Sequence, residues 1–260
     1  MSFSARYAGV IASVLTLLTG ILWWWMDQIY SGAFWADYTT PVPTLTYFCE
    51  RTLVDHFIRQ PTNTYTNLGY LWVGVYILLR GSKGPDSFLH RYPIYAWLYG
   101  LLCLYTCFGS AYFHASLALL PEQIDLSAVY GITALPLLYA LHHYLQLRGR
   151  SYSAWPFLLV WGLWMAWASI FTWEMRAHFV IPAFVGGAAV LLFLVRKSQS
   201  VPSRWYYALG FCIQAGLSFF WFDIARVGCF PDAVLHPHGL WHLSAAGGAF
   251  AFYGYMRRIG

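Results

Sequence analysis

The chain of 260 residues is 59% hydrophobic and only 10% charged, and its mean hydropathy is +0.52. A soluble domain usually carries about 25% charged residues, so this composition excludes an ordinary soluble protein and predicts an integral membrane protein. The net charge of +5 is not gathered into a basic run that would bind phosphates, and we therefore expect no nucleic-acid partner.

Eight apolar segments follow one another along the chain. Each is close to the ~20 residues that a helix needs to cross the hydrocarbon of a bilayer. They cover residues 8–26, 64–80, 93–114, 125–145, 154–173, 178–195, 205–222 and 238–256. The linkers between them are rich in Gly, Pro, Ser and charge, which break helices and favour water. The sequence therefore predicts an all-α, polytopic transmembrane helix bundle that forms a single domain.

The distribution of basic residues predicts the orientation of this bundle. With the N-terminus in the cytoplasm, eleven of the 15 basic residues fall on the cytoplasmic side: Arg6, Arg80, Lys83, Arg91, Arg148, Arg150, Arg196, Lys197, Arg204, Arg257 and Arg258. The positive-inside rule then places both termini in the cytoplasm. A cleaved signal peptide is the alternative for the first segment. The WWW run at 23–25 favours a retained anchor instead.

Two of the five cysteines, Cys49 and Cys229, fall in the two largest extracytoplasmic segments. An oxidising compartment would allow them to form a disulfide, the alternative being two unrelated free thiols. Cys103, Cys107 and Cys212 lie inside apolar segments, where a thiol packs as a small apolar side chain.

Isolated polar residues gather at one depth of the predicted bundle. Ser110 and His114 end the third segment, Asp125 opens the fourth, and His238 and His242 open the eighth. In the predicted orientation all five lie near the extracytoplasmic face. Residues four apart share one face of a helix, so His238 and His242 can bind one ion together.

Three imidazoles are a ligand set typical of zinc, which keeps an open position for water at catalytic sites. Asp125 is then the candidate proton carrier, and Ser110 the candidate hydrogen-bond donor. The alternative is that these histidines bond to carbonyl groups or line a water pocket without a metal. A zincin protease is excluded because HGLWH lacks the glutamate of HExxH. His142 and His143 lie near the cytoplasmic end, where we expect them to be solvated at the interface.

Three motifs together resemble the alkaline ceramidase family, within a superfamily of membrane hydrolases that includes adiponectin-receptor-like proteins. They are GSAYFH (109–114), followed by Asp125 eleven residues later, HGLWHLSAA (238–246), and CERTLVDHFIRQPTNTYTNLGYL (49–71). The resemblance extends from about Cys49 to the C-terminus.

The resemblance implies a seven-helix catalytic core at 64–260, preceded by an extra N-terminal helix at 1–30 and an extracytoplasmic loop at 31–63. It implies zinc held by His114, His238 and His242, with Asp125 near the metal-bound water and Ser110 beside it. It also implies a Cys49–Cys229 bridge and hydrolysis of ceramide, or a similar membrane lipid, to a fatty acid and a sphingoid base.

Two alternatives stay open within the superfamily: a receptor with a structural zinc, and a lipid-remodelling esterase. Animal and plant ceramidases also bind calcium around the Cys-Glu pair. Here Glu50 is kept, but Phe48 and Thr52 flank it, and Gln60 lies near the position of a second glutamate. These differences argue against calcium dependence and leave Glu50 as a weak calcium ligand. The exact lipid and the oligomeric state are not encoded in any motif.

Overall fold

The structure, a computed structural model, describes residues 6–38, 48–82, 87–197 and 203–258. Within these residues the chain is all-α apart from an isolated bridge between Ser31 and His56, which confirms the all-α part of the predicted fold class. The helices are α2 (Ala8–Ile29), the 3₁₀ helix η1 (Gly32–Trp35), α4 (Pro61–Thr66), α5 (Leu68–Arg80), α6 (Phe88–Arg91), α7 (Ile94–Ser116), α8 (Leu119–Leu147), α9 (Trp155–Ile170), α10 (Ala177–Lys197), α11 (Ser203–Ile224) and α12 (Pro237–Met256).

All eight predicted apolar segments are helical, but they differ in their capacity to span a membrane. Among the described residues, five helices are long and apolar enough to do so: α2, α7, α8, α10 and α11. Helix α5 has only 13 residues and α9 only 16. Helix α12 has 20 residues, but its His, Ser and Gly residues lower its mean hydropathy. The helices are those of a polytopic membrane protein, whereas the number of crossings and their orientation stay predictions.

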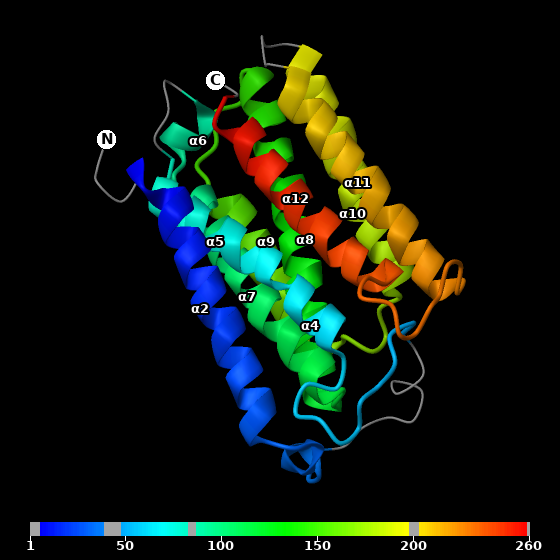
Figure 1. Cartoon of the computed structure of the whole chain (residues 1–260). Helices are drawn as coiled ribbons and strands as arrows, with labels where there is room; N and C mark the ends of the chain where they lie inside the picture. The colour runs from blue at the N-terminus through cyan, green and yellow to red at the C-terminus, as the bar shows by residue number, and fades with distance from the viewer. Residues whose placement is uncertain (1–5, 39–47, 83–86, 198–202, 259–260) are drawn as a thin grey trace.

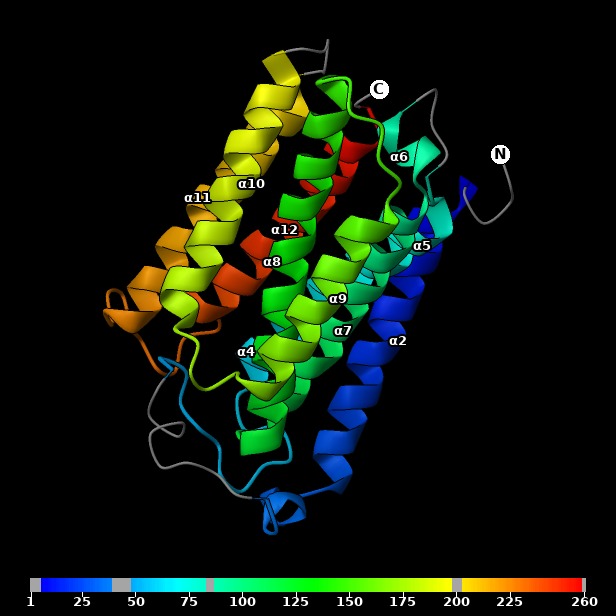
Figure 2. The same cartoon turned by 180° about the vertical axis from the view of Figure 1, so that it is seen from behind.

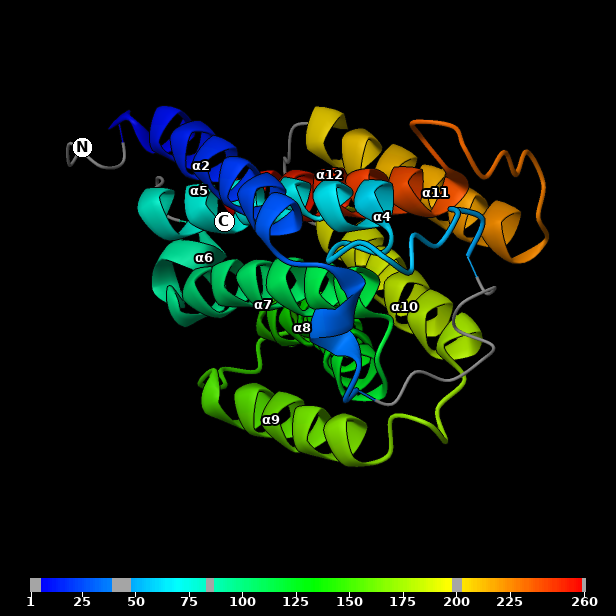
Figure 3. The same cartoon turned by 60° about the horizontal axis from the view of Figure 1, so that its bottom comes forward.

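The long helices run side by side along a common axis (Figure 1). Helices α7 and α8 pack together, α8 also contacts α10, and α12 packs against α11 and α5. Helix α2 lies against α5 at one edge, and α9 lies against α8 at another (Figure 3). The first turn of α2 and the last turn of α12 lie at the same end of the bundle (Figure 2). The chain at 48–60 and 225–236 covers the opposite end, and we call these stretches the two roof segments.

The helix that follows the first roof segment is broken into α4 and α5 at Asn67. Pro61 stands at the start of α4, where its missing N–H costs nothing. The Glu50 carboxylate accepts the backbone N–H groups of Thr62 at 2.6 Å and Asn63 at 2.8 Å, two amides that have no partner inside the helix. Burial raises the pKa of Glu50, and these two amide bonds partly counteract the shift. Glu50 therefore caps a helix.

A disulfide between Cys49 and Cys229 joins the two roof segments, which confirms the predicted bridge. Next to it, the Arg51 side chain pairs with Asp232 at 2.7 Å, and the backbone N–H of Arg51 donates to the carbonyl of Pro231. The bridge closes a long stretch of chain, with 180 residues separating its two cysteines. The roof segments are thereby fixed to each other over the end of the bundle.

Close packing between α11 and α12 depends on Gly254. A Cβ at this position would come within 2.3–2.7 Å of three carbon atoms of the Trp205 ring. The same ring also lies against Phe250 and under the guanidinium of Arg258. A larger residue at position 254 would therefore have to displace a ring that is held by other contacts.

We predict that Gly254→Ala lowers the melting temperature of the detergent-solubilised protein, because overpacking typically costs about 1–3 kcal/mol. The matched control is Gly210→Ala in α11, where nothing lies within 4 Å of the added Cβ. Alanine is the better helix former by about 1 kcal/mol, so the control should be unchanged or more stable. Equal melting temperatures for the two variants would contradict the predicted contact.

Candidate metal centre

Three histidine side chains meet below the roof segments. His114 lies in the last turn of α7, and His238 and His242 lie one turn apart at the start of α12. They are 0%, 5% and 5% exposed, and their ring centroids are 4.6–5.2 Å apart. One ligand nitrogen from each ring lies within 4.8 Å of the others. The structure thus confirms that these three predicted residues come together from two distant parts of the chain.

The Nδ1 atom of each ring is already bonded to the protein. His114 Nδ1 lies 2.8 Å from Gln60 Oε1, and His238 Nδ1 lies 3.2 Å from Asp223 Oδ2. A side-chain amide oxygen and an ionised carboxylate only accept hydrogen bonds, so each of these Nδ1 atoms carries a proton. The lone pair of each ring is then on Nε2.

His242 has the same arrangement. Its Nδ1 lies 3.1 Å from the backbone carbonyl of Asn63 and 3.1 Å from the Thr66 hydroxyl. Because a carbonyl oxygen cannot donate, this Nδ1 also carries the proton, and Nε2 is again the acceptor. The Nε2 atom of His114 is buried and has no hydrogen-bond partner among the described residues.

This donor set fits a first-row divalent metal ion. Imidazole nitrogens suit zinc, copper, iron and nickel, and zinc sites that perform catalysis use three protein ligands plus one open position. Metal-bound histidines usually donate their other N–H to a carboxylate, amide or carbonyl oxygen, as all three do here. Among the described residues, no fourth His, Cys, Asp or Glu belongs to the group.

No sequence motif predicts these Nδ1 partners. Gln60 was considered only as a substitution at a calcium position, and Asn63, Thr66 and Asp223 were not singled out. One signal existed for Asp223, which is an isolated carboxylate at the end of an otherwise apolar segment. Such a residue needs a partner at membrane depth.

Asp125 and Ser110, the two other residues predicted for the site, are polar residues of α8 and α7. Ser110 lies one turn before His114 on α7, and Asp125 lies in the second turn of α8, the helix packed against α7. Both residues are buried, and Asp125 Oδ1 has no partner in the described part of the chain. Asp125 is not one of the three grouped ligands, so it remains available for a proton.

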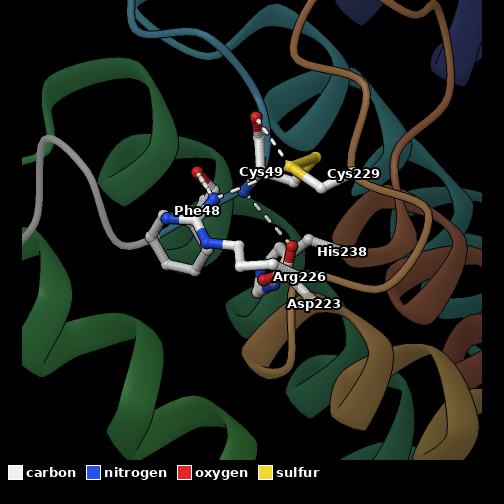
Figure 4. The surroundings of a disulfide bond; sticks show 6 residues. All are labelled: Phe48, Cys49, Asp223, Arg226, Cys229 and His238. Carbon is white, nitrogen blue, oxygen red and sulfur yellow. Dashed lines mark hydrogen bonds and ion pairs between the residues drawn. A yellow bond between two sulfur atoms is a disulfide. The ribbon is translucent and has the colours of Figure 1, made fainter.

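The first roof segment covers the centre with an aromatic ring. The Phe48 ring packs edge-on against His114 and His238, at centroid distances of 4.9 Å and 4.4 Å. Figure 4 shows Phe48 and Cys49 beside His238, Asp223 and the disulfide. This contact shields the two imidazoles from water on the roof side.

An apolar cavity of about 120 Å³ lies in the bundle between α8, α10, α11 and α12. Trp241, which stands between the two histidines of α12, is part of its lining. The Trp241 ring lies 5.0 Å from the His238 ring and 5.6 Å from the His242 ring, measured between centroids. Cys212 and Thr133 are among the few lining residues with polar atoms. An alkyl group in this cavity would therefore lie close to the histidine group.

The expectation that His142 and His143 are solvated is wrong. They are 0% and 2% exposed, because Phe88 and Phe157 stack on their rings. His142 Nδ1 lies 3.0 Å from the Tyr95 hydroxyl. The burial of these histidines could not be read from their position in the chain, since the covering rings come from two other helices, α6 and α9.

The fold and the site together define a helical membrane protein with a buried group of three histidines. Compared with models of known protein families and with curated proteins, the chain matches none.

We predict that His114→Ala abolishes stoichiometric metal binding, because two imidazoles from one helix turn cannot complete a three-ligand site. Elemental analysis of protein equilibrated with zinc should give about one ion per chain for the wild type and close to none for the variant. The control is His90→Ala, which alters an exposed histidine in α6 at the other end of the bundle. Equal zinc content in the two variants would disprove the assignment.

Proposed function

We propose that this protein is a zinc-dependent intramembrane amidase that hydrolyses ceramide or a similar N-acyl lipid to a free fatty acid and a sphingoid base. The observation that carries the proposal is the buried histidine group, in which all three Nδ1 atoms donate to protein oxygens and all three Nε2 atoms are left for one ion. The resemblance of the same residues to the alkaline ceramidase motifs supports the choice of substrate.

A zinc ion held by these histidines would polarise the amide carbonyl and lower the pKa of a bound water to about 7. Asp125 Oδ1 takes the proton of the attacking water, since this oxygen is buried and free of other partners among the described residues. As the carbonyl carbon gains its bond to the water oxygen, the C–N bond breaks and Asp125 delivers the proton to the leaving nitrogen. Ser110, one turn before His114 on α7, would hold the carboxyl group in position through its hydroxyl.

The group holds three histidines and no fourth ligand among the described residues, which favours this role over that of a receptor with a structural zinc, because structural sites are normally closed by four protein ligands. The apolar cavity next to Trp241 supports a lipid substrate. Its volume is comparable to that of engineered protein cavities that bind benzene, so it holds a few carbon atoms of an acyl chain. The remainder of the chain would extend into the bilayer.

The proposal includes a membrane arrangement. The seven-helix catalytic core would consist of α4 and α5 together as one segment, followed by α7, α8, α9, α10, α11 and α12. Helix α2 would be an addition to this core. Both termini would be cytoplasmic, which places the histidine group at the extracytoplasmic side. The disulfide supports this orientation, because disulfides persist in oxidising compartments.

We predict that Asp125→Asn lowers amide hydrolysis by at least about 100-fold while zinc content stays unchanged, since the amide cannot take up the proton. Glu174→Gln, which alters an exposed acidic residue between α9 and α10, should retain activity. Mass spectrometry of ceramide and phosphatidylcholine incubated with zinc-loaded protein provides the measurement. Cleavage of the ester lipid alone would favour the esterase alternative, and cleavage of neither lipid would favour the receptor.

A second substitution tests the cavity. Ala188 of α10 lines it and is 5% exposed, so Ala188→Phe should fill the space. We predict that this variant loses activity toward long-chain N-acyl substrates while keeping most activity toward short-chain ones. Ala183→Phe, an exposed position on the same helix, should leave the chain-length profile as in the wild type. A profile that is unchanged in both variants would show that acyl chains bind elsewhere.

A further inference from the structure

Asp223 is the one acidic residue of α11, in the last turn of that helix. Its side chain is only 2% exposed. A carboxylate costs free energy at such a position unless hydrogen bonds compensate for the lost water. Asp223 takes no part in the proposed proton transfers, so its burial requires a separate explanation.

Both oxygens of the Asp223 carboxylate are engaged, and they face different parts of the structure. Oδ2 accepts the Nδ1–H of His238 at 3.2 Å. Oδ1 accepts the backbone N–H of Cys49 at 3.2 Å. Figure 4 shows the carboxylate between the histidine and the disulfide-bonded residue. The carboxylate thus bridges a candidate metal ligand and the first roof segment.

Other contacts fix the Cys49 end of this bridge. The disulfide ties Cys49 to Cys229, six residues after Asp223 in the chain. The Arg226 guanidinium donates to the carbonyl of Phe48 at 2.7 Å. The backbone N–H that bonds to Asp223 therefore belongs to a segment held on both sides, by a covalent bond and by an ionic hydrogen bond.

Asp223 also differs from the other Nδ1 partners in charge. His114 bonds to the neutral amide of Gln60, and His242 bonds to a neutral carbonyl and a hydroxyl. Only His238 bonds to a carboxylate, which orients an imidazole more firmly and makes its other nitrogen a stronger metal donor. Removing this contact should therefore weaken metal binding by more than the loss of a neutral partner.

We propose that Asp223 is the positioning residue of His238 and that it transmits the constraint of the Cys49–Cys229 disulfide to the metal centre. The inference rests on the metal-binding part of the proposed function and is independent of the lipid substrate. We therefore expect changes at Asp223 or at the Cys49–Cys229 disulfide to lower metal affinity without disrupting the fold.

The test is the zinc dissociation constant of purified full-length protein, measured without lipid by competition with a chromophoric chelator. Asp223→Asn should weaken zinc binding by about 10- to 100-fold, because the NH2 group that replaces one carboxylate oxygen cannot accept a hydrogen bond, so either His238 or Cys49 loses its acceptor. Asp223→Glu keeps the carboxylate and should recover part of the affinity. Asp232→Asn is the matched control, since Asp232 lies in the second roof segment and forms an exposed ion pair with Arg51.

Two further measurements separate positioning from a merely structural role. The visible absorption of the cobalt-substituted protein should change in Asp223→Asn and stay as in the wild type in Asp232→Asn. The double variant Cys49→Ser/Cys229→Ser should weaken zinc binding several-fold in the wild-type background and have little further effect in the Asp223→Asn background.

The outcomes distinguish this inference from the proposed function. A wild-type protein that binds no zinc would overturn the metal centre itself. A wild-type protein that binds zinc, together with an Asp223→Asn variant whose dissociation constant and cobalt spectrum are unchanged, would overturn only the role of Asp223. If Asp223→Asn merely lowers the melting temperature of the metal-free protein, the residue is structural and the inference is wrong.

Discussion

Three imidazoles are buried at one end of the helix bundle, and the structure around them depends on providing hydrogen-bond partners for their nitrogens. A polar group at that depth costs free energy unless it has a partner, and each ring presents two nitrogens. Each Nδ1 has its acceptor in a different part of the chain. His114 bonds to Gln60 in the first roof segment, His242 to the Asn63 carbonyl in α4, and His238 to Asp223 at the end of α11. The elements that supply these acceptors are therefore held in place by the same contacts.

This requirement gives the roof segments and the N-terminal helix a structural purpose. The backbone N–H groups of Arg59 and Gln60 donate to carbonyls at the end of α7, which places the Gln60 side chain next to His114. Further along, the Asp27 carboxylate of α2 accepts the N–H of Ile58 at 2.8 Å, and the Trp35 indole donates to the carbonyl of Phe57 at 2.7 Å. Helix α2 thus supports the roof segment that orients one candidate ligand, although α2 lies at the edge of the bundle.

The sequence was sufficient for the parts of the structure that follow a periodic or local rule. The apolar segments predicted the long helices, and the four-residue spacing of His238 and His242 predicted that they act as a pair. Matching depth placed His114 at the level of this pair, and only the resemblance to the ceramidase motifs implied that the three side chains meet. The break between α4 and α5 was not predicted, because 64–80 reads as one apolar run although Asn67 interrupts it. The Nδ1 partners were also missed, since one of them is a backbone carbonyl that no motif identifies.

The arrangement of hydrogen bonds also bears on why a cation fits the centre better than water. With every Nδ1 donating outward, three acceptor nitrogens lie within 4.8 Å of one another. A water molecule has two protons and can donate to two of them, which leaves one buried acceptor unpaired at a cost of about 1–3 kcal/mol. Protonating His114 or His242 would instead bury a charge next to neutral hydrogen-bond partners. A single divalent ion would bond to all three lone pairs at once.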